Sequence, residues 1–246
     1  MTDGEDILMI PKYIHYCWFG SAEKSETFRK CIRSWESLYP DYEIMEWNET
    51  NSDFRNSAYA MEAYACRKFA FVADYVRLKV LAEYGGIYLD TDVEMLKRDR
   101  SLEDMDFAAG FEADNRVGTA VIFAQKKEPL IVEWLQSYEN RHFQQKNGKM
   151  DLTPNVRELT ELLKGKGWQI DGREQRKNRR ILLPRETFYP YSIGDRNVSL
   201  KNSLAVHWCE GSWVSGKLRF KHGLIRLVKR FLGKTRYERL RKLLIR

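Results

Sequence analysis

The hydrophobic pattern of the chain alternates between short apolar runs and longer stretches with a helical period. Ile10 to Gly20 is an aromatic-rich apolar run closed by glycine, which predicts a buried strand. Thr27 to Tyr39 repeats apolar residues every three or four positions, which predicts a helix that ends at Pro40. Tyr42 to Trp47 alternates and predicts a second strand. A strand, a helix and a strand in this order are the opening unit of nucleotide-binding α/β folds.

The longest helical pattern runs from Ala58 to Tyr84, in one or two pieces, and Gly85 is its expected stop. Asp74 and Arg77 are spaced i, i+3 on it and can face the same way. The pattern is apolar on most sides, so we expect the helix to be buried. A buried carboxylate and guanidinium form either a structural ion pair or a polar cluster directed at a ligand, and these residues alone leave both interpretations open.

A short strand pattern, Ile87 to Leu89, runs into the triplet Asp90-Thr91-Asp92. On a continuing strand the two carboxylates would share a face, with their Cα atoms about 6 to 7 Å apart. Two hard oxygen donors on one side suit Mg²⁺ or Mn²⁺. The same triplet recurs at Asp104-Met105-Asp106, where it precedes a strand pattern, and there we interpret it as a solvated turn.

The second half of the chain continues the mixture of strands and helices. Asp151 to Asn155 supplies capping residues for the helix that follows it. His207, near the end of the last strand, is either a core histidine or a third ligand for a metal held by carboxylates. The predicted elements are a strand hairpin formed by Phe107–Glu112 and Thr119–Ala124 around the loop Ala113–Gly118, helices over Leu130–Tyr138 and Val156–Leu163, a polar surface excursion over Gly165–Arg180, and a last strand over Leu204–Trp208.

The charge of the chain is concentrated at its carboxyl end. Residues Lys217 to Arg246 hold twelve Lys and Arg against one acid, a net charge of +11, whereas the whole chain carries +7. Regularly spaced apolar residues make this segment a basic amphipathic helix, broken at Gly233. It can bind an anionic membrane surface, pack on its own domain or on a partner protein, or bind nucleic acid. We favour the membrane surface, because no nucleic-acid motif accompanies the charge, and we divide the chain into a domain over 1–216 and a tail over 217–246.

Composition bounds the class of protein. With 246 residues and 43% hydrophobic composition, the chain can bury the core of one large domain. Its four cysteines form no CxxC pair and no signal peptide is recognisable, so we expect a reduced, cytoplasmic protein without a disulfide framework or zinc site. No run approaches the roughly 18 to 20 apolar residues of a spanning helix. Attachment to the inner face of the plasma membrane would therefore be peripheral.

Four sequence blocks stand in order along the chain: IPKYIHYCWFG, DYEIMEWNE, FAFVADYVRLKVLAEYGGIYLDTDVE and VHWCEGSW. Together they resemble glycosyltransferase family 32, the DXD-containing sugar transferases of capsule and lipopolysaccharide synthesis, which are related to initiation mannosyltransferases and large glucosylating toxins. The resemblance covers Ile10 to Trp213 and leaves the basic tail outside. It implies a GT-A fold, a Rossmann-like mixed sheet with helices on both faces, which uses a nucleotide-sugar donor and a divalent metal, commonly Mn²⁺.

The resemblance also implies roles for individual residues. Asp90 and Asp92 would be the DXD pair, with Asp92 the direct metal ligand and Asp90 also touching ribose and sugar. Asp74 and Arg77 would hold the sugar hydroxyls and phosphate, and His207 would be the C-terminal metal ligand. The other implied donor contacts are Trp18 stacking on the base, Tyr88 beside the nucleoside, and Ser212 and Trp213 over the diphosphate.

The expected reaction is transfer of a hexose from a UDP- or GDP-sugar to a glycan or lipid-linked glycan acceptor, with retention of anomeric configuration, in surface polysaccharide synthesis. A metal and Arg77 would stabilise the departing diphosphate. No strand-end carboxylate stands out as a covalent nucleophile, so we favour front-face substitution; Glu112 and Asp114 are the acids to consider otherwise. The loops that carry these two residues, together with Thr153 and Asn155, are the expected acceptor site.

Two other classes of function fit part of the pattern. A metal-dependent phosphoesterase or nuclease could use the same carboxylates while the basic tail grips a polyanion. Two-metal enzymes usually need more ligands than Asp90, Asp92 and His207 supply, and we expect no nucleic-acid partner. A non-catalytic protein that binds sugar nucleotides is the other alternative.

Overall fold

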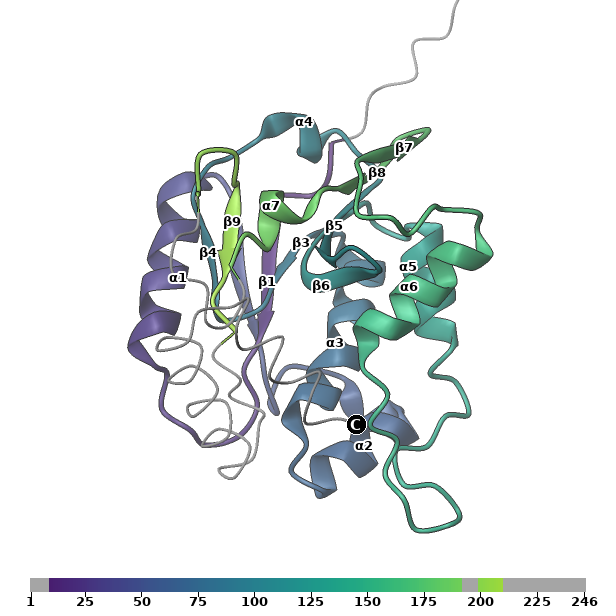
Figure 1. Cartoon of the computed structure of the whole chain (residues 1–246). Coiled ribbons are helices and arrows are strands. Elements are labelled where there is room, and N and C mark those ends of the chain that lie inside the picture. Colours follow the sequence, from purple (N-terminus) through teal and green to yellow (C-terminus); the bar gives the residue numbers. More distant parts are fainter. Residues whose placement is uncertain (1–8, 192–198, 210–246) are drawn as a thin grey trace, which may run out of the picture.

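A seven-stranded sheet forms the centre of the computed structural model, which describes residues 9–191 and 199–209 (Figure 1). The strand order is β2-β1-β3-β6-β5-β8-β7, and a separate two-stranded sheet pairs β4 with β9. The strands of the large sheet are β1 (Tyr13–Cys17), β2 (Glu43–Trp47), β3 (Gly86–Leu89), β5 (Phe107–Ala113), β6 (Arg116–Ala124), β7 (Gln175–Lys177) and β8 (Arg180–Leu183). Those of the small sheet are β4 (Val93–Met95) and β9 (Ala205–His207).

Parallel and antiparallel pairs are mixed in the large sheet. β1 pairs in parallel with both β2 and β3, and β5 pairs in parallel with β8. The pairs β3–β6, β5–β6 and β7–β8 are antiparallel. The predicted fold class, an α/β domain built on a mixed Rossmann-like sheet, is confirmed.

Helices cover both faces of this sheet. On one face, α2 (Ala58–Ala65), α3 (Phe69–Tyr84), α5 (Pro129–Gln136) and α6 (Asn155–Gly165) share a core with inward side chains such as Tyr88 and Ile122. On the other face, α1 (Glu26–Leu38), α4 (Arg100–Glu103), α7 (Arg185–Phe188) and the small sheet share a second core with Ile87 and Leu89. A 3₁₀ turn, η1 (Phe54–Asn56), precedes α2.

The ends of the first long helices follow their sequence signals. Ser25 caps α1 by accepting a hydrogen bond from the backbone N–H of Phe28 at 3.1 Å. The pattern over Ala58 to Tyr84 forms two helices, α2 and α3, and α3 ends at Gly85, whose φ of 70° lies in the left-handed region. Gly86 follows with a φ of 105° and starts β3. The Gly85-Gly86 turn therefore carries the chain from helix to strand as predicted.

The expected short strand over Ile87–Leu89 is confirmed, because β3 ends at Leu89. Asp90 to Asp92 form a turn in which the N–H of Val93 donates to the Asp90 carbonyl at 2.9 Å, so the shared face of a continuing strand does not apply to the triplet. Three other local predictions need correction. β6 already begins at Arg116, which shortens the expected hairpin loop. The polar excursion over 165–180 contains β7. Helix α6 has Pro154 at its N-cap and no side-chain cap, because a proline side chain carries no hydrogen-bond acceptor.

Several predictions concern residues outside the described ranges. Ser212, Trp213 and the whole basic tail, Lys217 to Arg246, belong to this part of the chain. Among the residues that are described, no helix combines the length and apolar character needed to cross a bilayer.

Candidate functional site

The carboxyl ends of the parallel strands place the first site residues at one edge of the sheet. Trp18 follows β1, and Asp90 follows β3, which pairs in parallel with β1. The backbone N–H of Asp90 donates to the carbonyl of Ala120 on β6 at 2.9 Å, which fixes the start of the turn. This edge is where open α/β sheets bind ligands.

The small sheet brings His207 to the same turn. β4 and β9 pair antiparallel, with His207 opposite Val93, and the N–H of Trp208 donates to the Asp92 carbonyl at 2.9 Å. The Nε2 atom of His207 lies 3.1 Å from Oδ1 of Asp92. Ligand atoms of Asp90, Asp92 and His207 all lie within 4.8 Å of one another. We call these three residues the carboxylate–imidazole cluster.

The cluster fits a divalent cation of the Mn²⁺ or Mg²⁺ type, because carboxylate oxygens and one imidazole are suitable ligands for it. The three side chains keep between 17% and 29% of their surface exposed, so they are accessible from solvent. Burial lowers the pKa of His207, but the Asp92 carboxylate and the Cys209 thiol outweigh it and raise this pKa well above its ordinary value. Metal ligation needs a neutral imidazole, so a bound cation would displace that proton.

Arg77 connects α3 to the cluster. Its side chain is 4% exposed, and one terminal nitrogen donates to the Thr119 carbonyl at 2.6 Å. The other terminal nitrogen donates to Oδ1 of Asp90 at 2.9 Å and lies 3.4 Å from Oδ1 of Asp74. The guanidinium lies 4.4 Å above the centre of the Tyr88 ring. Its buried Nε has no hydrogen-bond partner among the described residues.

Asp74 and Arg77 differ in how readily they change protonation near neutral pH. Burial raises the pKa of Asp74 to about 7, although the nearby Arg77 lowers it. Burial lowers the pKa of Arg77, but Asp90, Tyr88 and Asp74 outweigh it and raise this pKa above its usual value. Arg77 therefore stays cationic, and Asp74 is the member that gains a proton near neutral pH.

Asn155 belongs to this network, which corrects its expected place in an acceptor loop. It is 8% exposed, and its Nδ2 donates to Oδ1 of Asp74 at 2.5 Å. Its Oδ1 accepts from the Thr119 hydroxyl at 3.0 Å. Because both polar ends are bonded inside the domain, Asn155 supports the Asp74–Arg77 pair.

The position of Tyr88 also does not fit its expected role beside the nucleoside. The side chain is 1% exposed and lies beneath the Arg77 guanidinium. It therefore has no surface with which to border a nucleoside, and it supports Arg77 instead. Trp18 does keep exposed surface; its ring packs 5.2 Å from that of Phe28, and its Nε1 donates to the Ala22 carbonyl at 3.2 Å.

The other expected acceptor residues are spread over two places. Glu112, near the end of β5, pairs with Arg116 at 3.3 Å, and burial raises its pKa although Arg116 and the nearby His207 lower it. Asp114 is exposed in the hairpin turn. Thr153 lines a pocket of about 440 Å³ with Arg141, Asp151 and Glu158, and sequence reasoning missed that trio. Arg141 pairs with Asp151 at 2.8 Å and with Glu158 at 2.6 Å, contacts that no local pattern signals.

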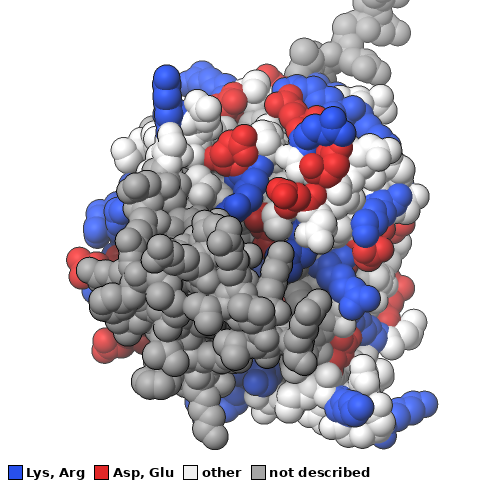
Figure 2. Space-filling model, viewed as in Figure 1, with Lys and Arg blue, Asp and Glu red and all other residues white. Residues whose placement is uncertain are grey.

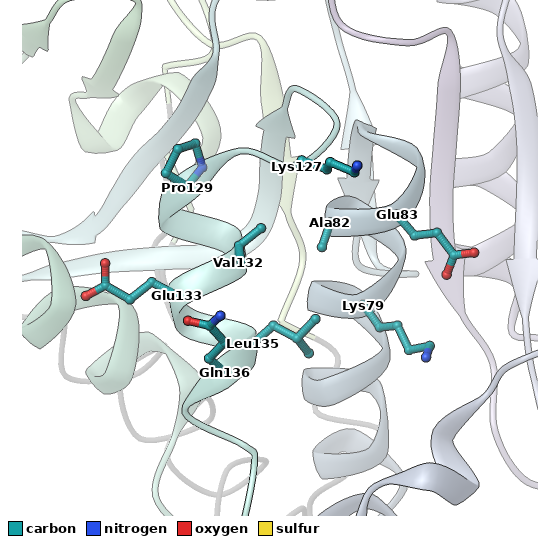
Figure 3. Close-up of a pocket in the computed structure, with 9 residues that line it drawn as sticks. All are labelled: Lys79, Ala82, Glu83, Lys127, Pro129, Val132, Glu133, Leu135 and Gln136. Atoms are coloured by element: carbon teal, nitrogen blue, oxygen red, sulfur yellow. The ribbon is translucent and has the colours of Figure 1, made fainter.

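A larger surface pocket of about 810 Å³ lies between α3 and α5 (Figure 3). Lys79, Glu83, Lys127 and Glu133 stand at it with apolar side chains such as Val132 and Leu135. None of the predicted site residues lines it. Acidic and basic side chains are interspersed over the described part of the face in Figure 2, which offers a polyanion no broad basic field there.

Comparison with known proteins concerns the segment that contains the Asp90-Thr91-Asp92 triplet. Residues 25–107 match the family model described as a glycosyltransferase sugar-binding region containing a DXD motif. The predicted resemblance to DXD-containing glycosyltransferases is confirmed. The matched segment includes Asp74, Arg77, Asp90 and Asp92, and it ends well before His207.

One curated relative is inositol phosphoceramide mannosyltransferase 3 of Schizosaccharomyces pombe, 36% identical over 88 residues. The match takes in 34% of this chain and spans about a quarter, 24%, of that relative's length.

Similar solved structures are glycosyltransferases. The PaToxG glycosyltransferase is 21% identical with a TM-score of 0.48, over 64% of this chain and 69% of that one. The galactosyltransferase LgtC in complex with donor and acceptor sugar analogues is 16% identical with a TM-score of 0.39, over 86% and 93% of the two chains. A glycosyltransferase involved in glycosylation of the major capsid of PBCV-1 is 13% identical with a TM-score of 0.41, over 87% and 100%.

Proposed function

We propose that this chain is a glycosyltransferase that moves a sugar from a nucleotide-sugar donor to a glycan acceptor with the help of a divalent cation. The observation that carries the proposal is the junction of two parts of one site. Asp90 belongs to the carboxylate–imidazole cluster and also accepts from Arg77, which stands beside Asp74. The match of residues 25–107 to the DXD sugar-binding region supports the same conclusion.

In this proposal Asp90, Asp92 and His207 hold the cation, Mn²⁺ or Mg²⁺. A bound cation would supply Lewis-acid stabilisation of the negative charge that develops on the departing diphosphate. Arg77 adds a fixed positive charge whose position is set by Thr119 and Asp90. Because Arg77 is held before the donor arrives, little reorganisation is needed during the reaction.

Donor recognition is assigned to the same edge of the sheet. The Asp74 carboxylate, held by Asn155, can accept hydrogen bonds from sugar hydroxyls. Trp18 offers a ring for the base of a UDP- or GDP-sugar. The proposed assay identifies which hexose is transferred and which nucleotide carries it.

We favour retention of anomeric configuration by front-face substitution, in which the departing phosphate oxygen takes the proton of the acceptor hydroxyl. Glu112 is the acid that would serve a covalent route, because it lies near His207 and is partly buried. Replacing Glu112 with Gln separates the routes. Front-face transfer should survive this change, and loss of turnover with unchanged donor binding would favour Glu112 as nucleophile.

The direct test incubates the full chain with Mn²⁺ and a panel of UDP- and GDP-sugars while nucleotide release and thermal shift are followed. We expect at least one donor to raise the melting temperature in a metal-dependent way and to release its nucleotide. If no donor does so, the proposal fails. Release of phosphate from phosphoesters or cleavage of nucleic acid under the same conditions would support the phosphoesterase alternative.

A role in surface polysaccharide synthesis, with a glycan or lipid-linked glycan acceptor at the inner membrane surface, is the biological setting that we propose. The basic tail would supply the attachment, since clustered Lys and Arg attract anionic lipid. Deletion of Lys217 to Arg246 should reduce binding to vesicles that contain phosphatidylglycerol and leave donor hydrolysis intact. Unchanged vesicle binding would refute this attachment.

A further inference from the structure

Tyr189, a residue that the proposed mechanism does not use, lies between the two segments that carry the carboxylate–imidazole cluster. It is 3% exposed and follows α7. Its hydroxyl oxygen accepts hydrogen bonds from the backbone N–H groups of both Ala120 and Val121, at 3.0 and 3.2 Å. In a regular strand, successive N–H groups point to opposite sides, so one oxygen can accept both only where the strand is irregular.

The irregularity is present in β6. The pairing of β5 with β6 shifts register between Ala109 and Phe111, so that Ala109 stands opposite Ile122 while Phe111 stands opposite Val117. This shift takes the intervening part of β6 out of the regular ladder with β5. The Tyr189 hydroxyl thereby satisfies backbone donors that would otherwise be buried at a cost.

Gly118 makes room for this arrangement. A Cβ atom at Gly118 would lie 2.4 Å from Cζ of Tyr189 and 2.6 Å from its hydroxyl oxygen, far closer than normal contacts allow. The φ of Gly118 is not in the left-handed region, so the need for glycine here is spatial. An alanine at 118 would have to displace the Tyr189 side chain.

From this position Tyr189 reaches both halves of the cluster. Ala120, whose N–H it accepts, in turn accepts the N–H of Asp90 at 2.9 Å. The Tyr189 ring packs against the His207 ring, with centroids 5.9 Å apart and an interplanar angle of 80°. β9 is a three-residue strand whose start is tied to α7 by a bond from Leu204 N–H to the Thr187 carbonyl at 2.8 Å.

We propose that Tyr189 is a positioning residue that sets the distance between the Asp90–Asp92 turn and His207, and so sets the affinity of the site for its divalent cation. The inference rests on the proposed function, because it concerns how the same cluster is held. Tyr189 acts through its contacts with Ala120, Val121 and His207. Its burial prevents it from touching a donor or an acceptor.

The test compares three variants of the full chain. Tyr189→Phe keeps the ring and removes the hydroxyl. Gly118→Ala leaves Tyr189 itself unaltered and adds a methyl group that displaces the Tyr189 side chain. Tyr39→Phe is the matched control, because Tyr39 is 1% exposed and its hydroxyl has no hydrogen-bond partner among the described residues. Mn²⁺ alone is titrated by calorimetry, and nucleotide release is measured over a range of Mn²⁺ concentrations.

We expect Tyr189→Phe and Gly118→Ala to weaken Mn²⁺ binding by roughly 10-fold to 100-fold, the range that supporting residues of metal ligands show. Saturating Mn²⁺ should restore most of the nucleotide release, since the ligands themselves are intact. The double variant should be little weaker than either single one, because both changes remove the same contact. Tyr39→Phe should bind Mn²⁺ as the unaltered chain does.

Three results would overturn the inference, and they differ in what else they overturn. If the unaltered chain binds Mn²⁺ and Tyr189→Phe binds it within about twofold of Tyr39→Phe, positioning by Tyr189 is wrong and the proposed function stands. If the unaltered chain itself binds no Mn²⁺, both the cation site and its positioning fall. A lower melting temperature of Tyr189→Phe without any change in Mn²⁺ affinity would mark a purely structural role, which also contradicts the inference.

Discussion

Arg77 donates to Asp90 at 2.9 Å, and this contact joins the residue expected at the donor sugar to one expected at the metal. Arg77 is also 3.4 Å from Asp74, so a single buried cation balances two carboxylates. The arrangement holds both acids in place before any ligand binds. Its cost is that loss of the cation leaves the Asp74 and Asp90 carboxyl groups close together without their positive partner.

Replacement of Arg77 by Met should therefore lower the free energy of unfolding by about 3 to 5 kcal/mol, as expected when one partner of a buried ion pair is removed. Urea unfolding at neutral pH measures the loss. Lys79→Met is the matched control on the same helix, because Lys79 pairs with Asp53 near the surface and solvent screens that pair. If both variants lose the same stability, the Arg77 network is not held as described.

The two D-x-D triplets of the chain allow a second comparison. Asp92→Asn should abolish the Mn²⁺-dependent part of nucleotide release, because Asp92 stands within ligand distance of Asp90 and His207. Asp104→Asn changes the other triplet, in a turn before β5, and should leave release unchanged. Release and thermal shift with and without Mn²⁺ measure both. Full turnover by Asp92→Asn would show that the cation is held elsewhere.

Much of the architecture was predictable because its signals are local. The helical period to Tyr84, the glycines at 85 and 86 and the apolar run to Leu89 are neighbours in sequence, and they form α3, the turn and β3. The burial of Tyr88 also had a signal that was not used. It lies within an unbroken apolar run, which is typical of a strand covered on both faces, and all four residues of β3 are buried.

The assembly of the site was predictable only in part, because its contacts join distant segments. His207 meets Asp92 through the pairing of β4 with β9, and strand pairing depends on the whole topology. Asn155 reaches Asp74 across 81 positions, and neither residue carries a local mark of that bond. The capping interpretation failed for a local reason, since the N-cap position is held by Pro154, whose side chain has no acceptor.

A buried histidine beneath the glycine turn should give the fold a dependence on pH. His15 is fully buried, and burial lowers its pKa from 6.5 to about 4, although the bond to the Gly85 carbonyl raises it. Its Nε2 is 2.8 Å from that carbonyl, and its Nδ1 accepts from the Trp47 indole at 3.1 Å, so one neutral tautomer satisfies both contacts. Protonation would place an N–H against the Trp47 N–H.

Because the folded-state pKa of His15 is depressed, its contribution to stability is present above pH 6.5 and is lost as the pH falls towards 4. The difference corresponds to about 3 kcal/mol in all. His15→Gln keeps a donor and an acceptor but cannot titrate, so its free energy of unfolding should fall less over this window. His142→Gln, at an exposed histidine, should retain the dependence of the unaltered chain. Parallel curves for His15→Gln and the unaltered chain would refute the assignment.

The glycine turn itself gives the last prediction. A Cβ at Gly86 would lie 2.5 Å from the Tyr13 carbonyl oxygen, and the φ of 105° is unfavourable for any other residue. Gly86→Ala should therefore lower the free energy of unfolding by about 2 kcal/mol or more. The strain falls on the β1–β3 pairing, which has two registered residue pairs, Ile14 with Ile87 and His15 with Tyr88. Mn²⁺ affinity should fall as well, since Asp90 directly follows β3.

Gly165→Ala is the matched control for this change. Gly165 ends α6, and its φ is not in the left-handed region. Apart from its chain neighbours and its own helix backbone, no atom of the described residues lies within 4 Å of the position of its Cβ. Alanine there should leave stability unchanged or raise it by up to about 1 kcal/mol. In thermal and urea unfolding, the stability of Gly86→Ala should therefore fall, whereas that of Gly165→Ala should stay unchanged or rise. Equal stability of Gly86→Ala and Gly165→Ala would mean that the turn below the site does not hold β1 and β3 together.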